Sequence, residues 1–175
     1  MGRLNLDHHK ILFEPSRIEL LDVPRSTKQF LSTHGLPRTH ALNISFSGTD
    51  GTFPQIDAYC QSRGLHHPPD GGDLYRIGSD EGTQICLERG SGTVVSIDPE
   101  GKHRPRFINS NIELMIEFLN LYAEYASGAQ SLAEERALRL VATTKMKMRE
   151  IDEAAFKDEN TWWAVVCEQM EHGIL

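Results

Sequence analysis

The chain has few cysteines, and none of them falls in a metal-binding or disulfide pattern. Cys60, Cys86 and Cys167 are far apart, odd in number and without a Cys-x-x-Cys spacing. A disulfide framework needs paired cysteines in a secreted protein. We therefore interpret Cys86, in an apolar strand, and Cys167, in a helix, as small core residues.

Long apolar runs are also missing. No stretch approaches the ~20 residues of a membrane span, and residues 1–10 lack the apolar run of a signal peptide. We expect a cytoplasmic protein that does not contact a membrane.

Basic residues are outnumbered, with 18 Lys and Arg against 25 Asp and Glu and a net charge of -7. Nucleic-acid binding needs a concentrated positive field, so nucleic acid is not expected as a direct ligand. An acidic surface would speed the encounter with a basic partner, although it would equally serve solubility alone.

Catalytic signatures are absent as well. The sequence has no G-x-S-x-G elbow, P-loop or Rossmann fingerprint, and no His-x-Glu with Pro-Cys-x-x-Cys of the zinc deaminases. The pairs His8–His9 and His66–His67 are adjacent, so their side chains diverge instead of converging on a metal. We predict no catalytic residue, no metal and no cofactor.

The most informative stretch that is present runs from Tyr75 to Asp98. It predicts three short strands separated by two glycine-rich turns, with Gly78–Gly82 and Gly90–Gly92 supplying positive φ angles. Residues 78–82 superficially resemble a phosphate cradle, but they lie between strands and are interpreted as a turn. A compact meander of this kind presents a surface, which favours binding over catalysis.

Capping-box spacing, Ser followed by Gln or Glu at the third position, predicts helix starts at Ser26, Ser110 and Ser131. The first helix is expected to end at His34, and the second at about Ala126. Other expected elements are a strand over residues 42–46, an irregular recognition loop over 47–72, a strand over 106–109, a stop at Gly128 and a final helix over 161–172. At least one of Trp162 and Trp163 should anchor the core, and Lys145, Lys147 and Arg149 should form a solvated face.

Four of these stretches together are similar to a known family. Residues 30–37, 75–98 and 106–125, and the closing Ile151-Asp152…Trp162-Trp163…Glu168-Gln169-Met170, resemble the fourth subgroup of the SUKH immunity-protein superfamily. The resemblance implies an α+β fold with a twisted, mainly antiparallel sheet and packed helices. It also implies a bacterial protein that binds a toxin of a polymorphic toxin system, often a nuclease. Glu81 departs from the pattern, because glycine is more usual in that turn.

On this basis residues 1–175 are expected to form one immunity domain with a C-terminal helical extension, its first 22 residues loosely ordered. Acidic residues at loops and strand ends are candidates for contacting the toxin, because they could imitate phosphates in a basic nuclease cleft. A solvated rim is the alternative interpretation. The candidates are Asp70, Asp73, Asp80, Glu81, Glu88, Asp98 and Glu100.

The sequence offers three candidate functions. The first is a non-enzymatic immunity protein that occludes its cognate toxin stoichiometrically. The second is an adaptor or regulatory module that binds a cellular protein without any toxin. The third is a hydrolase using His103 with Asp98 or Asp80, which is disfavoured because no positioned nucleophile or water activator accompanies these residues.

Overall fold

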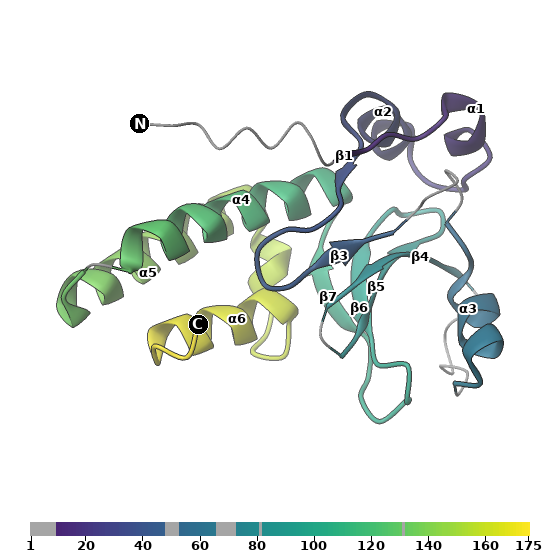
Figure 1. Cartoon of the computed structure of the whole chain (residues 1–175). Coiled ribbons are helices and arrows are strands. Elements are labelled where there is room, and N and C mark those ends of the chain that lie inside the picture. The colour runs from purple at the N-terminus through teal and green to yellow at the C-terminus, as the bar shows by residue number, and fades with distance from the viewer. Residues whose placement is uncertain (1–9, 48–52, 66–72, 81, 131) are drawn as a thin grey trace.

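A five-stranded antiparallel sheet with helices on both faces forms the centre of the molecule (Figure 1). The computed structural model describes residues 10–47, 53–65, 73–80, 82–130 and 132–175. The strand order is β3 (Ser45–Phe46), β4 (Leu74–Ser79), β5 (Gln84–Glu88), β6 (Val94–Ile97) and β7 (Arg106–Asn109). A separate two-stranded sheet pairs β1 (Lys10–Ile11) with β2 (Leu36–Pro37). The predicted α+β class, antiparallel sheet and C-terminal helices are confirmed.

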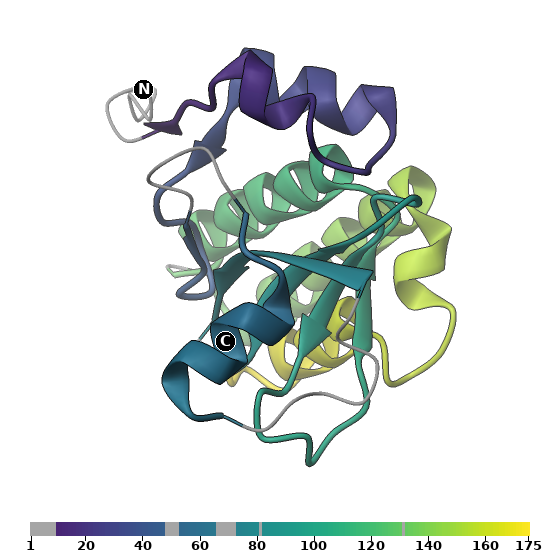
Figure 2. The same ribbon diagram turned by 90° about the vertical axis from the view of Figure 1, so that its right-hand side faces the viewer.

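The helices divide between the two faces of the sheet. The long helices α4 (Ile112–Ala129) and α5 (Glu134–Ile151), together with α6 (Trp162–Glu171), lie on one side, and α3 (Ile56–Arg63) lies on the other (Figure 1). A short 3-10 helix, η3 (Glu153–Phe156), connects α5 to α6. The N-terminal helices α1 (Pro15–Ile18) and α2 (Arg25–His34) lie together across one end of the molecule (Figure 2).

Alternation along the meander explains this layering. On β5, Ile85 and Leu87 belong to the large core cluster, whereas Cys86 belongs to the small cluster beneath α3. On β6, Val94 joins the large cluster and Ile97 the small one. Successive side chains of a strand point to opposite faces, so the continuous apolar run of this sequence corresponds to a sheet covered on both sides.

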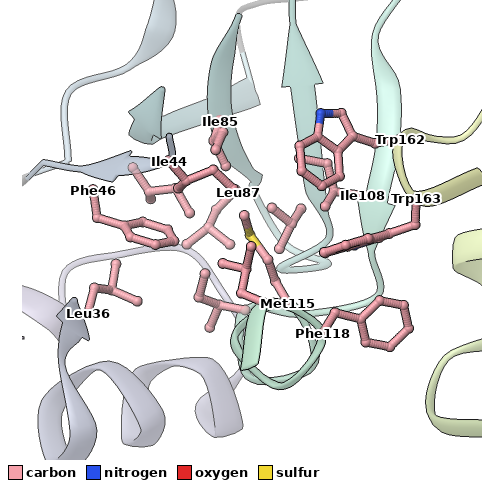
Figure 3. Packing of buried hydrophobic residues seen from close by; sticks show 14 of the residues in the cluster. Leu36, Ile44, Phe46, Ile85, Leu87, Ile108, Met115, Phe118, Trp162 and Trp163 are labelled. Carbon is pink, nitrogen blue, oxygen red and sulfur yellow. The ribbon is translucent and has the colours of Figure 1, made fainter. Parts of the chain in front are cut away.

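The large core lies between the sheet and α4. Met115 of α4 lies beneath the strands that carry Leu87 and Ile108, and the Phe118 ring lies beside Trp163, with centroids 5.2 Å apart (Figure 3). From α6 the core receives Trp163, which is fully buried, and Trp162, which is 9% exposed. Their rings meet edge to face with centroids 4.8 Å apart. The prediction that at least one tryptophan anchors the core is confirmed.

A buried hydrogen-bond network holds the C-terminal helices against β7. The Asp152 carboxylate accepts the Asn109 amide N–H at 3.1 Å, the Ser110 backbone N–H at 2.8 Å and the Ser110 hydroxyl at 2.8 Å. The Trp163 indole N–H donates to Asn109 Oδ1 at 2.8 Å. These residues come from the strand, from the junction after α5 and from α6, so the network fixes how α6 sits against the sheet.

The predicted capping boxes are wrong. The N-cap of α4 is Asn111, whose Oδ1 accepts the Leu114 N–H at 3.0 Å, while Ser110 is engaged by Asp152 instead. Pro24 and Ala133 occupy the N-cap positions of α2 and α5 without a side-chain cap; the expected Ser131 lies outside the described residues. The Ser-x-x-Glu or Ser-x-x-Gln spacing can occur near a helix start without forming a capping box. At α4, the hydrogen bond from Ser110 to Asp152 and the neighbouring Asn111 determine which residue is the N-cap.

Three further boundaries also differ from expectation. The strand predicted over residues 42–46 shrinks to Ser45–Phe46, because Leu42 and Asn43 adopt φ angles of 60° and 54°. Gly128 lies inside α4, which continues to Ala129. The segment 47–72, expected to be irregular, contains α3, whose Ile56 and Cys60 are buried against the sheet.

Among the described glycines of the two predicted turns, positive φ angles occur in the second turn only. Gly90 and Gly92, between β5 and β6, have φ of 76° and 72°. Gly78 instead lies within β4, where a Cβ would come 2.6 Å from the Ser45 carbonyl oxygen. This glycine is needed because the β3 backbone approaches closely.

Candidate partner-binding groove

The candidate acidic residues lie at two opposite ends of the sheet. Asp73 precedes β4 and Glu88 ends β5, beside the turn that faces α2. Asp80, Asp98 and Glu100 follow β4 and β6 at the other end, where the long β6–β7 loop (residues 98–105) extends beyond the sheet (Figure 1). Asp70 and Glu81 lie outside the described residues. The described candidates therefore do not form one continuous surface.

At the end near α2, the carboxylates face basic or hydroxyl groups. Arg89 lies between Asp73, at 3.5 Å, and Asp22, at 3.4 Å, and its guanidinium stands 5.9 Å from the centre of the Tyr75 ring. The Glu88 carboxylate accepts the Ser91 hydroxyl at 2.6 Å. Asp73 and Glu88 are exposed, so both remain accessible to a partner.

At the other end, two carboxylates serve mainly to hold loops. Asp98 accepts the backbone N–H groups of Glu100 at 2.9 Å and of Lys102 and His103 at 3.1 Å each. These bonds fix the β6–β7 loop.

Asp80 does the same for the β4–β5 turn. Its Oδ1 accepts the Gly82 N–H at 3.1 Å and the Thr83 N–H at 2.7 Å. Of the described candidates at this end, only Glu100 is exposed, and it pairs with Lys102.

Between the β6–β7 loop and α6 lie three adjoining depressions, which we call the β6–β7 groove. The largest, of about 590 Å³, is lined by His103, Arg104, Phe107 and the segment around Asn160. Two smaller ones, of about 160 and 310 Å³, continue toward Asp80 and the exposed side of α6. Arg106 lines all three, and Trp162 lines the two smaller ones, so the depressions form one recessed surface.

The groove carries two cations for which the described part of the chain supplies no ion-pair partner. Among the described residues, no carboxylate lies within ion-pair distance of Arg104 or Arg106. Both arginines are exposed. As far as the described residues are concerned, the five donors of each guanidinium are therefore available to water or to a bound molecule.

Arg104 and Arg106 are not among the residues predicted from the sequence, although the sequence contains a signal for them. Residues 102–106 read Lys-His-Arg-Pro-Arg, a concentration of basic side chains in a chain of net charge -7. The candidates predicted from the sequence in this region are the acidic residues Asp98 and Glu100, which precede the run. The depression itself could not be predicted, because it depends on how α6 is held against β7.

The hydrolase interpretation gains no geometric support from Asp98 and His103. The Asp98 carboxylate accepts the backbone N–H of His103, and between the described residues no hydrogen bond joins it to the imidazole ring. The pairs His8–His9 and His66–His67 lie outside the described residues. In the part of the chain that the structure describes, no group of three or more His, Cys, Asp or Glu side chains is arranged to hold a metal ion.

All three thiols are buried. Burial raises the pKa of Cys86 to about 12 and that of Cys167 to about 11, and it also raises the pKa of Cys60. Thiols with such pKa values stay protonated near neutral pH and are poor nucleophiles. The interpretation of Cys86 and Cys167 as core residues is confirmed.

The basic face predicted for Lys145, Lys147 and Arg149 is partly engaged within the protein. Lys145 donates to Glu171 at 2.6 Å, and the Arg149 guanidinium stands 5.3 Å from the centre of the Phe156 ring.

Across the described residues, no helix combines the length and the apolar character needed to cross a bilayer.

One comparison with known proteins gives a match. A family model described as SUKH-4 immunity protein matches residues 7–169, which is most of the chain. No curated protein and no solved structure matches. The match includes both the strands that form the groove and the helices that close it.

Proposed function

Because the chain belongs to the SUKH-4 immunity protein family, we propose that it neutralises a toxin of a bacterial polymorphic toxin system by binding it stoichiometrically and covering its active site. The observation that carries this proposal is the family match over residues 7–169. No residue of the chain then performs a chemical step, and protection depends on affinity alone. The protein would act in the cytoplasm, as one unit in which sheet and helices share a core.

The structure supports a binding role through the way the groove is built. The Asn109–Asp152–Trp163 network fixes α6, and Asp98 fixes the β6–β7 loop, so the two walls of the groove are held before a partner arrives. A preformed surface loses less conformational freedom on binding, which favours tight association.

We further propose that the toxin is a basic protein, such as a nuclease, and that the acidic surface speeds its approach. The net charge of -7 supports this proposal, as does the exposure of Asp73, Glu88 and Glu100. Asp80 and Asp98 are better suited to holding turns than to contacting a partner, since their oxygens already accept backbone donors. Asp70 and Glu81 remain candidates from the sequence.

A second candidate function is a non-enzymatic adaptor that binds a cellular protein. One observation favours it: some of the stretches that carry the family resemblance contain Asn109, Ser110, Asp152 and Trp163, which hold the fold together. A shared scaffold does not by itself specify the partner. A toxin gene adjoining the gene for this protein would favour immunity, and its consistent absence would favour the adaptor.

The test is protection in cells. The toxin encoded by the adjoining gene is expressed from an inducible promoter, with or without this protein, and growth is followed. We expect growth to be restored and the two proteins to co-purify. Continued killing at an excess of soluble, folded protein would contradict the proposal.

A further inference from the structure

We infer that the β6–β7 groove receives an acidic segment of the toxin, with Arg104 and Arg106 binding its carboxylates and Trp162 forming the apolar wall. This inference rests on the proposed function, since it identifies the surface and the partner chemistry through which that function would be exercised. It differs from the acidic-surface proposal, because it assigns short-range contact to cations.

The first support is which charged side chains of the groove have hydrogen-bond partners within the described residues. The acidic side chains that line it are engaged: Asp98 accepts three backbone N–H groups, Asp80 accepts two, and Asp158 accepts the Asn160 N–H at 2.8 Å. Arg104 and Arg106 have no such partner among the described residues. Among the described residues, the charged side chains of the groove that lack a hydrogen-bond or ion-pair partner are therefore the two arginines.

The second support is that the arginine-bearing segment is held in place. The loop leaves β6 at Asp98, which binds the backbone at Lys102 and His103, and it re-enters the sheet at Arg106, paired with Ser96 in β6. Arg104 is confined between these two anchors. A planar guanidinium positioned in this way can bind a carboxylate through two parallel N–H donors.

The third support is the apolar surface beside the cations. Trp162 is 9% exposed and packs edge to face on the buried Trp163, so it offers a rigid ring edge instead of a mobile side chain. Phe107 lines the largest depression next to Arg106. Tryptophan and arginine are the residue types that most often dominate the energy of protein–protein contacts.

A protein segment suits this groove better than a nucleic acid. A nucleic-acid site presents basic side chains over several successive phosphates, and it belongs to a surface with a positive field. Here two arginines stand on a protein of net charge -7. One or two carboxylates on a loop match this local charge, whereas a chain of phosphates would meet repulsion on either side.

The first experiment measures affinity for the toxin encoded by the adjoining gene. The charge-reversed double variant Arg104→Glu, Arg106→Glu is compared with Arg136→Glu, Lys147→Glu, which makes the same change in net charge on the exposed surface of α5. We expect the groove variant to lose about 10-fold or more in affinity, because carboxylates facing it would meet like charge. The α5 variant should bind as the unchanged protein does.

The second experiment tests the partner chemistry directly. In Arg104→Lys the positive charge is kept, and a carbodiimide can couple the new amine to a carboxylate in contact with it. We expect an amide cross-link between position 104 and an Asp or Glu of the toxin, identified by mass spectrometry. Arg136→Lys serves as the matched control and should not cross-link.

The outcomes separate this inference from the proposed function. If the unchanged protein binds the toxin but the groove variant binds equally well, or if position 104 gives no cross-link, the groove assignment is overturned while the proposed function stands. If the unchanged protein does not bind the toxin, the proposed function fails and this inference falls with it. Saturable binding of an oligonucleotide that is lost only in the groove variant would overturn the inference in favour of a nucleic-acid site.

Discussion

At the scale of single residues, the β5–β6 turn contains two glycines with similar positive φ angles and different surroundings. A Cβ on Gly90 would meet no atom within 4 Å, whereas a Cβ on Gly92 would lie 2.8 Å from Pro24 Cδ and 3.0 Å from the Thr27 hydroxyl. The rigid proline ring cannot move aside easily. Gly92 therefore lets the meander approach the start of α2.

This pair gives a matched prediction. Gly90→Ala should lower the free energy of unfolding by about 1 kcal/mol, the cost of a side chain in the left-handed region. Gly92→Ala should lower it by about 1–3 kcal/mol more, the usual cost of overpacking. Urea unfolding of both variants measures the difference. Equal losses would show that the contact between turn and α2 is looser than described.

His40 predicts a pH dependence of stability. Burial lowers the pKa of the imidazole, partly offset by its hydrogen bond with Asn120 at 3.2 Å. The folded state therefore prefers the neutral ring. Stability from this residue is present above the unfolded pKa of about 6.5 and is lost as the pH falls through the lower folded value.

The measurement compares the unchanged protein with His40→Gln. Between about pH 7.5 and 5.5, the midpoint of urea unfolding should fall more in the unchanged protein than in the variant. Parallel losses in the two proteins would show that His40 is equally easy to protonate in the folded and unfolded states.

At the scale of secondary-structure elements, the attachment of the C-terminal helices depends on one buried carboxylate. Removing it in Asp152→Ala would leave the Asn109 amide and the Ser110 N–H without their acceptor. Unpaired buried donors are costly, so we expect a loss of about 3 kcal/mol in the free energy of unfolding. The neighbouring Glu153→Ala, which removes an exposed carboxylate, should change it by less than about 0.5 kcal/mol.

Hydrogen exchange would show where the loss acts. Amides of η3 and α6 should exchange faster in Asp152→Ala than in the unchanged protein, because the network holds these elements in place. The exchange of β4 and β5 amides should increase less. A uniform increase across all elements would contradict a local role for Asp152.

The elements differed in how far the sequence could predict them. The meander from Leu74 to Ile97 was predictable, because β-branched and apolar residues alternate with glycine turns. α6 was predictable because its apolar residues recur at helical spacing. The N-cap of α4 was not predictable, because the Ser110 hydroxyl donates to Asp152, a residue 42 positions away in the sequence.

The candidate site was harder to predict for the same physical reason. Acidic residues at loops look alike in a sequence whether they face a partner or bind their own backbone, as Asp98 does. Only the folded loop distinguishes the two cases. Arg104 and Arg106 are recognisable as candidates only in the folded protein, where they line a depression together with residues 158–161.

At the scale of the whole molecule, long-range and short-range electrostatics have opposite signs. The net charge of -7 would attract a basic toxin from a distance, while the groove presents Arg104 and Arg106 to an acidic segment at contact. The two effects are separable, since steering acts on the association rate and contacts act mainly on dissociation.

Electrostatic steering of the toxin is tested by reversing exposed carboxylates other than Asp80 and Asp98, which hold the β4–β5 turn and the β6–β7 loop. The variant Glu88→Lys, Glu100→Lys should associate more slowly with a basic toxin, and its association rate should depend less on salt concentration. Asp80 and Asp98 are left unchanged, so the β4–β5 turn and the β6–β7 loop keep their hydrogen bonds. Stopped-flow measurements at low and high salt provide the comparison. An unaltered rate in this variant would place these carboxylates outside the approach path.

We propose that protection comes from occupancy of the toxin by this protein. A fixed amount of the adjoining gene's toxin is titrated with the purified protein, and the residual toxin activity is measured. We expect a linear fall that reaches zero at a molar ratio of about one, as is usual when the concentrations far exceed the dissociation constant. Complete inactivation at a small fraction of that ratio would mean that each molecule acts repeatedly on the toxin, and protection by occupancy would then be wrong.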